Sequence, residues 1–169
     1  MRIFFLSVLL IGCLSTTAQI SPFSLASVPD SLKNKATFIT HISNSELEIE
    51  SLEKATLKVH KIFTVLSEEG KGALLFQQHT DRAIVLEDAE VKVYDKNGKQ
   101  ISKSRKKDFT TMAVGDGFVE DGYVTFYNIS AVAYPVTVEF NYTVKFKTTL
   151  ALPDYRYVRP GEAVIQSTF

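Results

Sequence analysis

The sequence predicts an all-β protein, an antiparallel β-sandwich with at most one short helix near residues 30–36. Residues 136–147 read VTVEFNYTVKFK, so every even position is apolar and every odd position is polar. A period of two places alternate side chains on opposite faces of an extended strand, one buried and one wet. The apolar content comes from Phe, Tyr, Val, Ile and Leu, and β-branched and aromatic residues suit pleated, half-buried surfaces. The crossover helices that a parallel α/β fold needs are missing from the pattern.

Residues 1–18 have the layout of a secretory signal peptide. Arg2 precedes an apolar run, and small residues then lead to Ala18, after which we expect cleavage. The apolar run is too short for a permanent membrane anchor. We therefore expect an exported protein that is periplasmic, outer-membrane associated or secreted. The alternative is a lipobox at residues 10–13 (LIGC) with lipidation of Cys13. Because Cys13 is the single cysteine, no intramolecular disulfide can form.

Residues 19–45 are expected to form a lead-in segment, and residues 46–169 the β-sandwich domain. In the lead-in, Asp30 or Ser31 is placed to cap one or two helical turns. Strands are expected at residues 37–42, 46–52, 55–66, 73–79, 84–94, 99–101, 123–127, 136–147 and 163–169. The last pattern is still in progress where the sequence stops, so we expect the domain to be truncated there.

Local signals define the turns between these strands. The strand at residues 55–66 alternates clearly, with Lys61 as the polar exception on its apolar side. Asn97 and Gly98 suit the two positive-φ positions of a type I′ turn and therefore predict a hairpin. Residues 109–122 are rich in glycine and acidic residues, and we expect them to form a long loop.

The residues give little support for catalysis or metal binding. His41, His60 and His79 recur at a regular spacing, but no cluster of further metal ligands surrounds them. No Ser–His or Cys–His arrangement typical of an activated nucleophile is present. We therefore predict no catalytic, metal-binding or cofactor-binding residue and no cofactor. The formal net charge is zero, so no general attraction favours a nucleic-acid partner.

Two surface features allow more than one interpretation. The basic residues between 103 and 107 suit a solvated strand edge, with an anion-binding patch as the less favoured alternative. A tyrosine-rich surface can bind a glycan or a partner chain, and packing in the core with the phenol at the rim is the alternative. The candidate residues of that surface are Tyr123, Tyr127, Tyr155 and Tyr157.

Five stretches, taken in order, resemble a known bacterial family. They are residues 55–60 (ATLKVH), 68–71 (EEGK), 93–99 (VYDKNGK), 107–109 (KDF) and 134–142 (YPVTVEFNY). Together they are similar to Domain of Unknown Function 3857, and the resemblance covers residues 46–169. It implies a β-rich domain that follows a signal peptide in Bacteroidota-like bacteria and precedes a transglutaminase-like domain with a Cys-His-Asp triad.

No residue of this sequence matches that triad. The resemblance therefore implies a non-catalytic accessory domain that supports a transglutaminase-like domain of the same protein, which is its expected partner. The alternative function is a stand-alone module of the bacterial envelope that binds a glycan or a protein through the tyrosine-rich surface.

Overall fold

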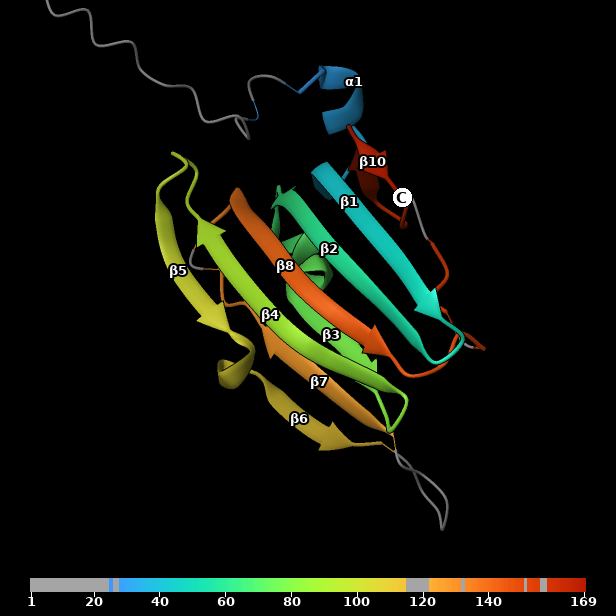
Figure 1. Cartoon of the computed structure of the whole chain (residues 1–169). Helices are drawn as coiled ribbons and strands as arrows, with labels where there is room; N and C mark the ends of the chain where they lie inside the picture. The colour runs from blue at the N-terminus through green and yellow to red at the C-terminus, as the bar shows by residue number, and fades with distance from the viewer. Residues whose placement is uncertain (1–24, 26–27, 115–121, 132, 151, 156–157) are drawn as a thin grey trace, which may run out of the picture.

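The computed structural model describes residues 25, 28–114, 122–131, 133–150, 152–155 and 158–169, which form two β-sheets (Figure 1). The larger sheet contains β1 (Phe38–Ser51), β2 (Lys54–Val65), β4 (Ile84–Tyr94), β5 (Gln100–Arg105), β8 (Val136–Phe146), β9 (Glu162–Val164) and β10 (Ser167–Thr168). The smaller sheet contains β3 (Leu75–Thr80), β6 (Thr110–Ala113) and β7 (Tyr123–Asn128). The short helical segments are the α-helix α1 (Asp30–Lys33) and the 3-10 turns η2 (Glu68–Leu74) and η3 (Lys106–Asp108).

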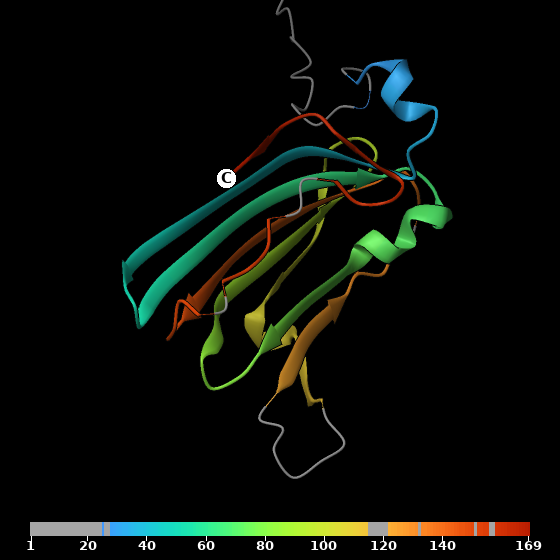
Figure 2. The same ribbon diagram turned by 90° about the vertical axis from the view of Figure 1, so that its right-hand side faces the viewer.

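The two sheets pack as layers, with the smaller one against one face of the larger one (Figure 2). The larger sheet has the order β10–β1–β2–β8–β4–β5, and β9 also pairs with β1; the smaller sheet has the order β3–β7–β6. Neighbouring strands are antiparallel except where β9 and β10 run parallel to β1. The prediction of an all-β, sandwich-like fold is confirmed, and α1 lies where the short helix was expected.

The hydrophobic core fills the space between the layers. On the central strand β8, the apolar residues of the alternating pattern point to this inner face, and Phe140 meets Phe76 of β3 with ring centroids 5.5 Å apart. Full burial of one such large side chain contributes about 1.5–3 kcal/mol. The expectation of a uniformly wet outer face is wrong at Thr137, which is buried and shares a hydrogen bond of 2.8 Å with Thr64.

The first strand is longer than the sequence predicted. The strands expected at residues 37–42 and 46–52 are one continuous strand, β1, so the domain boundary expected between residues 45 and 46 falls inside it. The polar residues between those two stretches stay in the strand because β1 pairs with β2 along its whole length, from Phe38 opposite Val65 to the turn at residues 51–54. Cross-strand pairing there outweighs low local β-propensity.

The expected hairpin joins β4 and β5, but the prediction of a type I′ turn is wrong. Among the described residues only glycines have positive φ, and Gly98 at 79° is one of them. The Asp95 carboxylate accepts hydrogen bonds from the N–H groups of Asn97 (2.8 Å) and Lys99 (3.0 Å). With the register shift at residues 93–94, this is the pattern of a longer loop with one left-handed glycine and a bulge.

Two further expectations need correction. Residues 109–122 are not a loop throughout, because residues 110–113 form β6; Thr111 there shares a side-chain hydrogen bond of 2.8 Å with Thr125 of β7. The strand expected at residues 163–169 is divided into β9 and β10. Residues 1–18, with Cys13, and residues 115–121 lie outside the described part of the chain. Within that part, no helix has the length and apolarity to cross a membrane.

Candidate functional site

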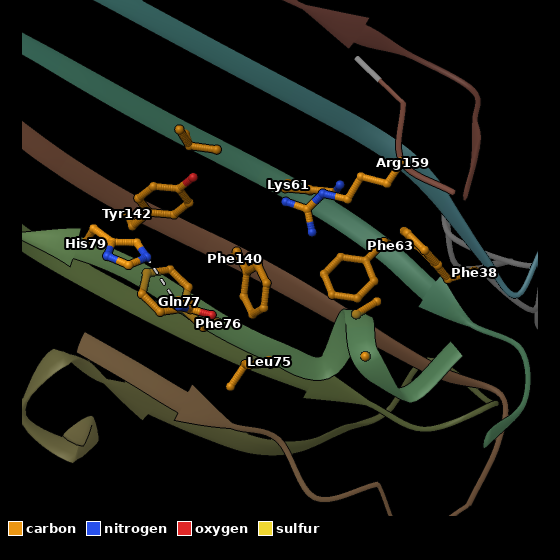
Figure 3. Close-up of a pocket in the computed structure, with 13 residues that line it drawn as sticks. Phe38, Lys61, Phe63, Leu75, Phe76, Gln77, His79, Phe140, Tyr142 and Arg159 are labelled. Atoms are coloured by element: carbon orange, nitrogen blue, oxygen red, sulfur yellow. Dashed lines mark hydrogen bonds between the residues drawn. The ribbon is translucent and has the colours of Figure 1, made fainter. Parts of the chain in front are cut away.

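The described residues leave a cleft between the two sheets, of about 400 Å³ (Figure 3). The inner face of β1, β2 and β8 forms one wall, and β3 with η2 forms the other. The aromatic side chains in its lining are Phe38, Phe63, Phe76, Phe140 and Tyr142.

The aromatic wall follows from the period of two along the strands. Phe140 and Tyr142 are two residues apart on β8, and Phe63 lies on the neighbouring strand β2. The rings meet edge to face, with centroid distances of 5.2 Å for Phe63–Phe140 and for Phe76–Tyr142. Such pairs add about 0.5–1.5 kcal/mol beyond their burial. The cleft therefore has a well-packed apolar wall that can receive a hydrophobic group.

Lys61 is the polar residue that the sequence places on this apolar side, and its ammonium group lies 2.8 Å from Glu162. The side chain of Glu162 is 3% exposed and also accepts hydrogen bonds from the Thr40 hydroxyl and the Arg159 backbone N–H. Burial by itself raises the pKa of Glu162, but these hydrogen bonds hold it below its ordinary value. Burial also lowers the pKa of Lys61, and the nearby Arg159 charge adds to this, despite the opposing attraction of Glu162.

Arg159 provides a second positive charge at the mouth of the cleft. Its guanidinium group points into the space beside Lys61 (Figure 3), and no described residue gives its side chain a hydrogen bond or an ion pair. Burial raises the pKa of Tyr142, while the positive charge of Arg159 acts in the opposite direction. Since Lys61 and Glu162 balance each other, the cleft carries one positive charge without a counter-ion among the described residues.

The remaining polar side chains of the cleft come from β3. His79 Nε2 lies 3.4 Å from the side-chain nitrogen of Gln77. Among the described lining residues there is no serine, threonine, cysteine or carboxylate beside His79. An activated nucleophile needs a base within hydrogen-bonding reach, and the base in turn needs an orienting partner. The described lining thus provides groups for binding and lacks a nucleophile–base pair.

The outer face of the larger sheet carries a separate polar network centred on Glu139. Its carboxylate accepts hydrogen bonds from Tyr94 (2.7 Å), Asn141 (3.0 Å) and Lys92 (3.3 Å). Burial alone would raise the pKa of Glu139, but these donors lower it overall. Burial first, and then the Glu139 carboxylate, raise the pKa of Tyr94. The donors saturate this carboxylate, so we assign the network a structural role.

The structure separates the tyrosines predicted to form a binding surface. Tyr127 is half-buried and packs against the core, where its ring stacks on Phe109 at 5.0 Å and its hydroxyl accepts a hydrogen bond from Ser104. Tyr123 is exposed at the start of β7, and Tyr155 packs against Phe169 near β10. Tyr157 lies outside the described residues. The three described tyrosines are thus placed in different parts of the fold.

The histidines and the basic run are also placed apart from the cleft, except for His79. His41 is buried on β1 with its Nε2 2.8 Å from the Thr64 hydroxyl, and His60 Nε2 lies 3.3 Å from Glu139 without hydrogen-bond geometry. No group of three metal-ligating side chains occurs in the described part of the chain. In the basic run, Lys103 pairs with Glu90 at 2.7 Å.

Residues 53–167 match the family Domain of Unknown Function 3857, for which a solved structure exists. The match spans more than half of the chain, so the chain belongs to this family, as the resemblance predicted. No curated protein matches the chain.

Among solved structures, the fold is similar to a crystal structure of a putative protease from Parabacteroides distasonis ATCC 8503. The TM-score is 0.56 at 8% sequence identity, and the similarity covers 66% of this chain. The matched part covers 23% of the Parabacteroides protein, so the similarity spans about a quarter of that protein's length. At this identity the similarity concerns the fold.

Proposed function

We propose that this chain is a non-catalytic accessory domain of an exported protein, in which it supports a transglutaminase-like domain that follows it. The observation that carries this proposal is the chemistry of the cleft, whose described lining joins aromatic rings with cations and lacks a nucleophile–base pair. Membership of the Domain of Unknown Function 3857 family agrees with it. The short share of the Parabacteroides protein that the similar fold occupies agrees with a module of a longer protein.

The proposed support is physical: the domain binds and positions a substrate, and the chemistry takes place in the neighbouring domain. Binding energy from groups remote from the reacting bond can contribute to orientation at the reactive centre. A fixed sandwich suits this role because its packed core holds the aromatic wall in place.

The proposal is tested first by the gene and then by assay. We expect the coding sequence downstream of Phe169 to encode a transglutaminase-like domain with Cys, His and Asp in triad order; an unrelated domain there would remove the proposed association. We also expect the purified chain alone to show no proteolysis of casein and no transfer of a fluorescent amine to it. Activity that survives purification and disappears in His79→Ala would instead make the cleft catalytic.

Export is tested by the mature N-terminus. Mass spectrometry of the protein from its native envelope is expected to show a chain that begins at Gln19. A diacylglyceryl group on Cys13 would replace signal-peptide removal by lipoprotein processing, and an intact Met1 would contradict export.

A stand-alone binding module is the second candidate function, and the cleft favours it more than the tyrosines do. It needs no neighbouring domain, so the downstream sequence discriminates between the two candidates.

A further inference from the structure

One edge of the smaller sheet faces the cleft. In the described structure β3 pairs with β7 and with no other strand. The Leu74 carbonyl accepts a hydrogen bond of 3.1 Å from the N–H of Ile129, which marks these two residues as a hydrogen-bonded pair. Such pairs alternate along an antiparallel ladder. The backbone groups of Phe76 and Gln78 therefore point to β7, and those of the residues between them point away.

The residues of β3 whose backbone groups point away from β7 also line the cleft. Leu75, Gln77 and His79 all contribute to the cavity, and they occupy the alternate positions whose N–H and C=O groups face away from β7. The His79 carbonyl accepts a hydrogen bond of 2.8 Å from the Gln78 side chain, whereas no described residue bonds to the backbone of Leu75 or Gln77. The cleft thus combines a row of available backbone groups with an aromatic wall.

The charge of the cleft selects among ligands. The charges of Lys61 and Glu162 balance each other, so Arg159 leaves the cavity positive. The ordinary complement of an unpaired guanidinium is a carboxylate, which it can bind through two parallel hydrogen bonds. Backbone groups spaced every second residue match the period of another extended polypeptide.

We propose that the cleft binds an extended acidic polypeptide segment, which adds as a strand to the free edge of β3. An apolar side chain of the segment enters the aromatic cavity, and a carboxylate of the segment pairs with Arg159. The strand would lie about 4.8 Å from β3. The inference rests on the proposed binding role of the domain and specifies its ligand class.

The probe is a fluorescein-labelled hexapeptide of alternating valine and threonine with a glutamate at one end, titrated into the purified chain while anisotropy is measured. We expect this peptide to bind. A second peptide with glutamine in place of the glutamate, the glutamine twin, is expected to bind roughly tenfold more weakly, because a charge-assisted hydrogen bond is lost. A twin with every amide N-methylated cannot form a strand ladder and is expected not to bind. Equal affinity of the three peptides, or no binding of the first, would overturn the proposal.

Hydrogen exchange measured by NMR tests the geometry directly. The amides of Leu75 and Gln77 are expected to exchange fast in the free chain and to become protected when the peptide binds. The amide of Phe76, which points to β7, is the internal control and is expected to be protected in both states. Peptide binding without new protection at Leu75 and Gln77 would exclude strand addition.

Variants test the two contacts separately. Arg159→Ala is expected to weaken binding of the glutamate peptide roughly tenfold and to leave the affinity for the glutamine twin unchanged. Arg105→Ala, on β5, is the matched control and should change neither affinity. Gln77→Pro removes one cleft-facing N–H, whereas Gln77→Ala removes only the side chain. If Gln77→Pro fails to fold, the N-methylated peptide still tests the ladder.

Other occupants give distinct results. Competition by chitin oligosaccharides but not by peptides would identify a glycan site, and dimerisation that blocks the peptide would identify a second copy as the occupant; both would overturn the proposal. Cleavage of the bound peptide would contradict the proposed non-catalytic function while leaving the peptide site intact. If the chain neither binds nor cleaves the peptide, the peptide-binding inference is wrong while the proposed non-catalytic function stands.

Discussion

Two lysine–carboxylate pairs on opposite faces of the larger sheet, Lys92–Glu139 and Lys61–Glu162, differ in how many partners their lysines have. On the outer face, Glu139 accepts hydrogen bonds from Lys92, Tyr94 and Asn141. Lys92 also lies 3.3 Å from Glu90, so each charge has more than one partner. On the inner face, Glu162 is the partner of Lys61, and Arg159, whose guanidinium has no partner among the described residues, lies near Lys61.

The pKa directions express the same difference. Burial lowers the pKa of Lys92, but its hydrogen bonds and charge interactions with Glu139 and Glu90 raise it overall. Burial lowers the pKa of Lys61, and there the attraction of Glu162 is not sufficient to reverse the shift. Two carboxylates therefore surround the outer lysine, whereas on the inner face the charge of Arg159 adds a positive potential that an anionic ligand would relieve.

The largest expected effect comes from removing the inner carboxylate. Glu162→Gln leaves the Lys61 charge shielded from water and beside Arg159, and we expect it to lower the free energy of unfolding by about 2–4 kcal/mol. Adding Lys61→Met to this variant removes the uncompensated charge and should restore most of the loss. Urea denaturation of the wild type, both single variants and the double variant measures this. An additive double variant would mean that the two charges are not coupled.

A smaller effect is expected on the outer face. Tyr94→Phe removes one hydrogen bond to Glu139 while Lys92 and Asn141 remain, so we expect a loss of about 1 kcal/mol. Tyr123→Phe is the matched control because Tyr123 is 47% exposed, and no described residue bonds to its hydroxyl. Urea denaturation of both variants measures the difference. A loss as large as that of Glu162→Gln would show that the outer network is as poorly compensated as the inner pair.

At alkaline pH, the contributions of Lys61 and Lys92 to stability should change with pH in opposite directions. The lowered pKa of Lys61 means that the unfolded chain holds this proton more tightly, so its contribution to stability increases as the pH rises towards 10.5. The raised pKa of Lys92 gives stability that is complete below 10.5 and is lost as the pH rises through the folded-state value. The stability difference between wild type and Lys61→Met should therefore increase with pH, and that for Lys92→Met should decrease. A change in the same direction for both variants would contradict the proposed difference between the two lysines.

The sequence predicted the fold better than it predicted the cleft, for a physical reason. Strand β8 is visible in the sequence because burial of alternate side chains repeats locally with a period of two. Lys61 was visible as the polar exception on an apolar strand face. Its partner Glu162 is far away in the chain and was not predicted, because only the parallel pairing of β9 with β1 brings it close.

Arg159 carried no local signal at all, since its role depends on where a segment outside the strands crosses the sheet. The tyrosines show the reverse case. Tyr127 and Tyr155 look alike in the sequence, but the fold packs the first, half-buried, against the core and places the second against Phe169. Residue type predicts the ability to bind, and the topology decides which residues share a surface.

The smallest expected effect on stability belongs to the residue with the largest expected effect on binding. Arg159 is exposed, has no described partner for its guanidinium group, and its charge repels that of Lys61. Arg159→Ala should therefore change the free energy of unfolding by no more than about 0.5 kcal/mol, measured by urea denaturation beside Arg105→Ala. Removing a residue that serves the fold lowers the stability of the protein, whereas removing a residue retained for a ligand does not. A loss comparable to that of Glu162→Gln would place Arg159 with the structural charges and leave the cleft without its free cation.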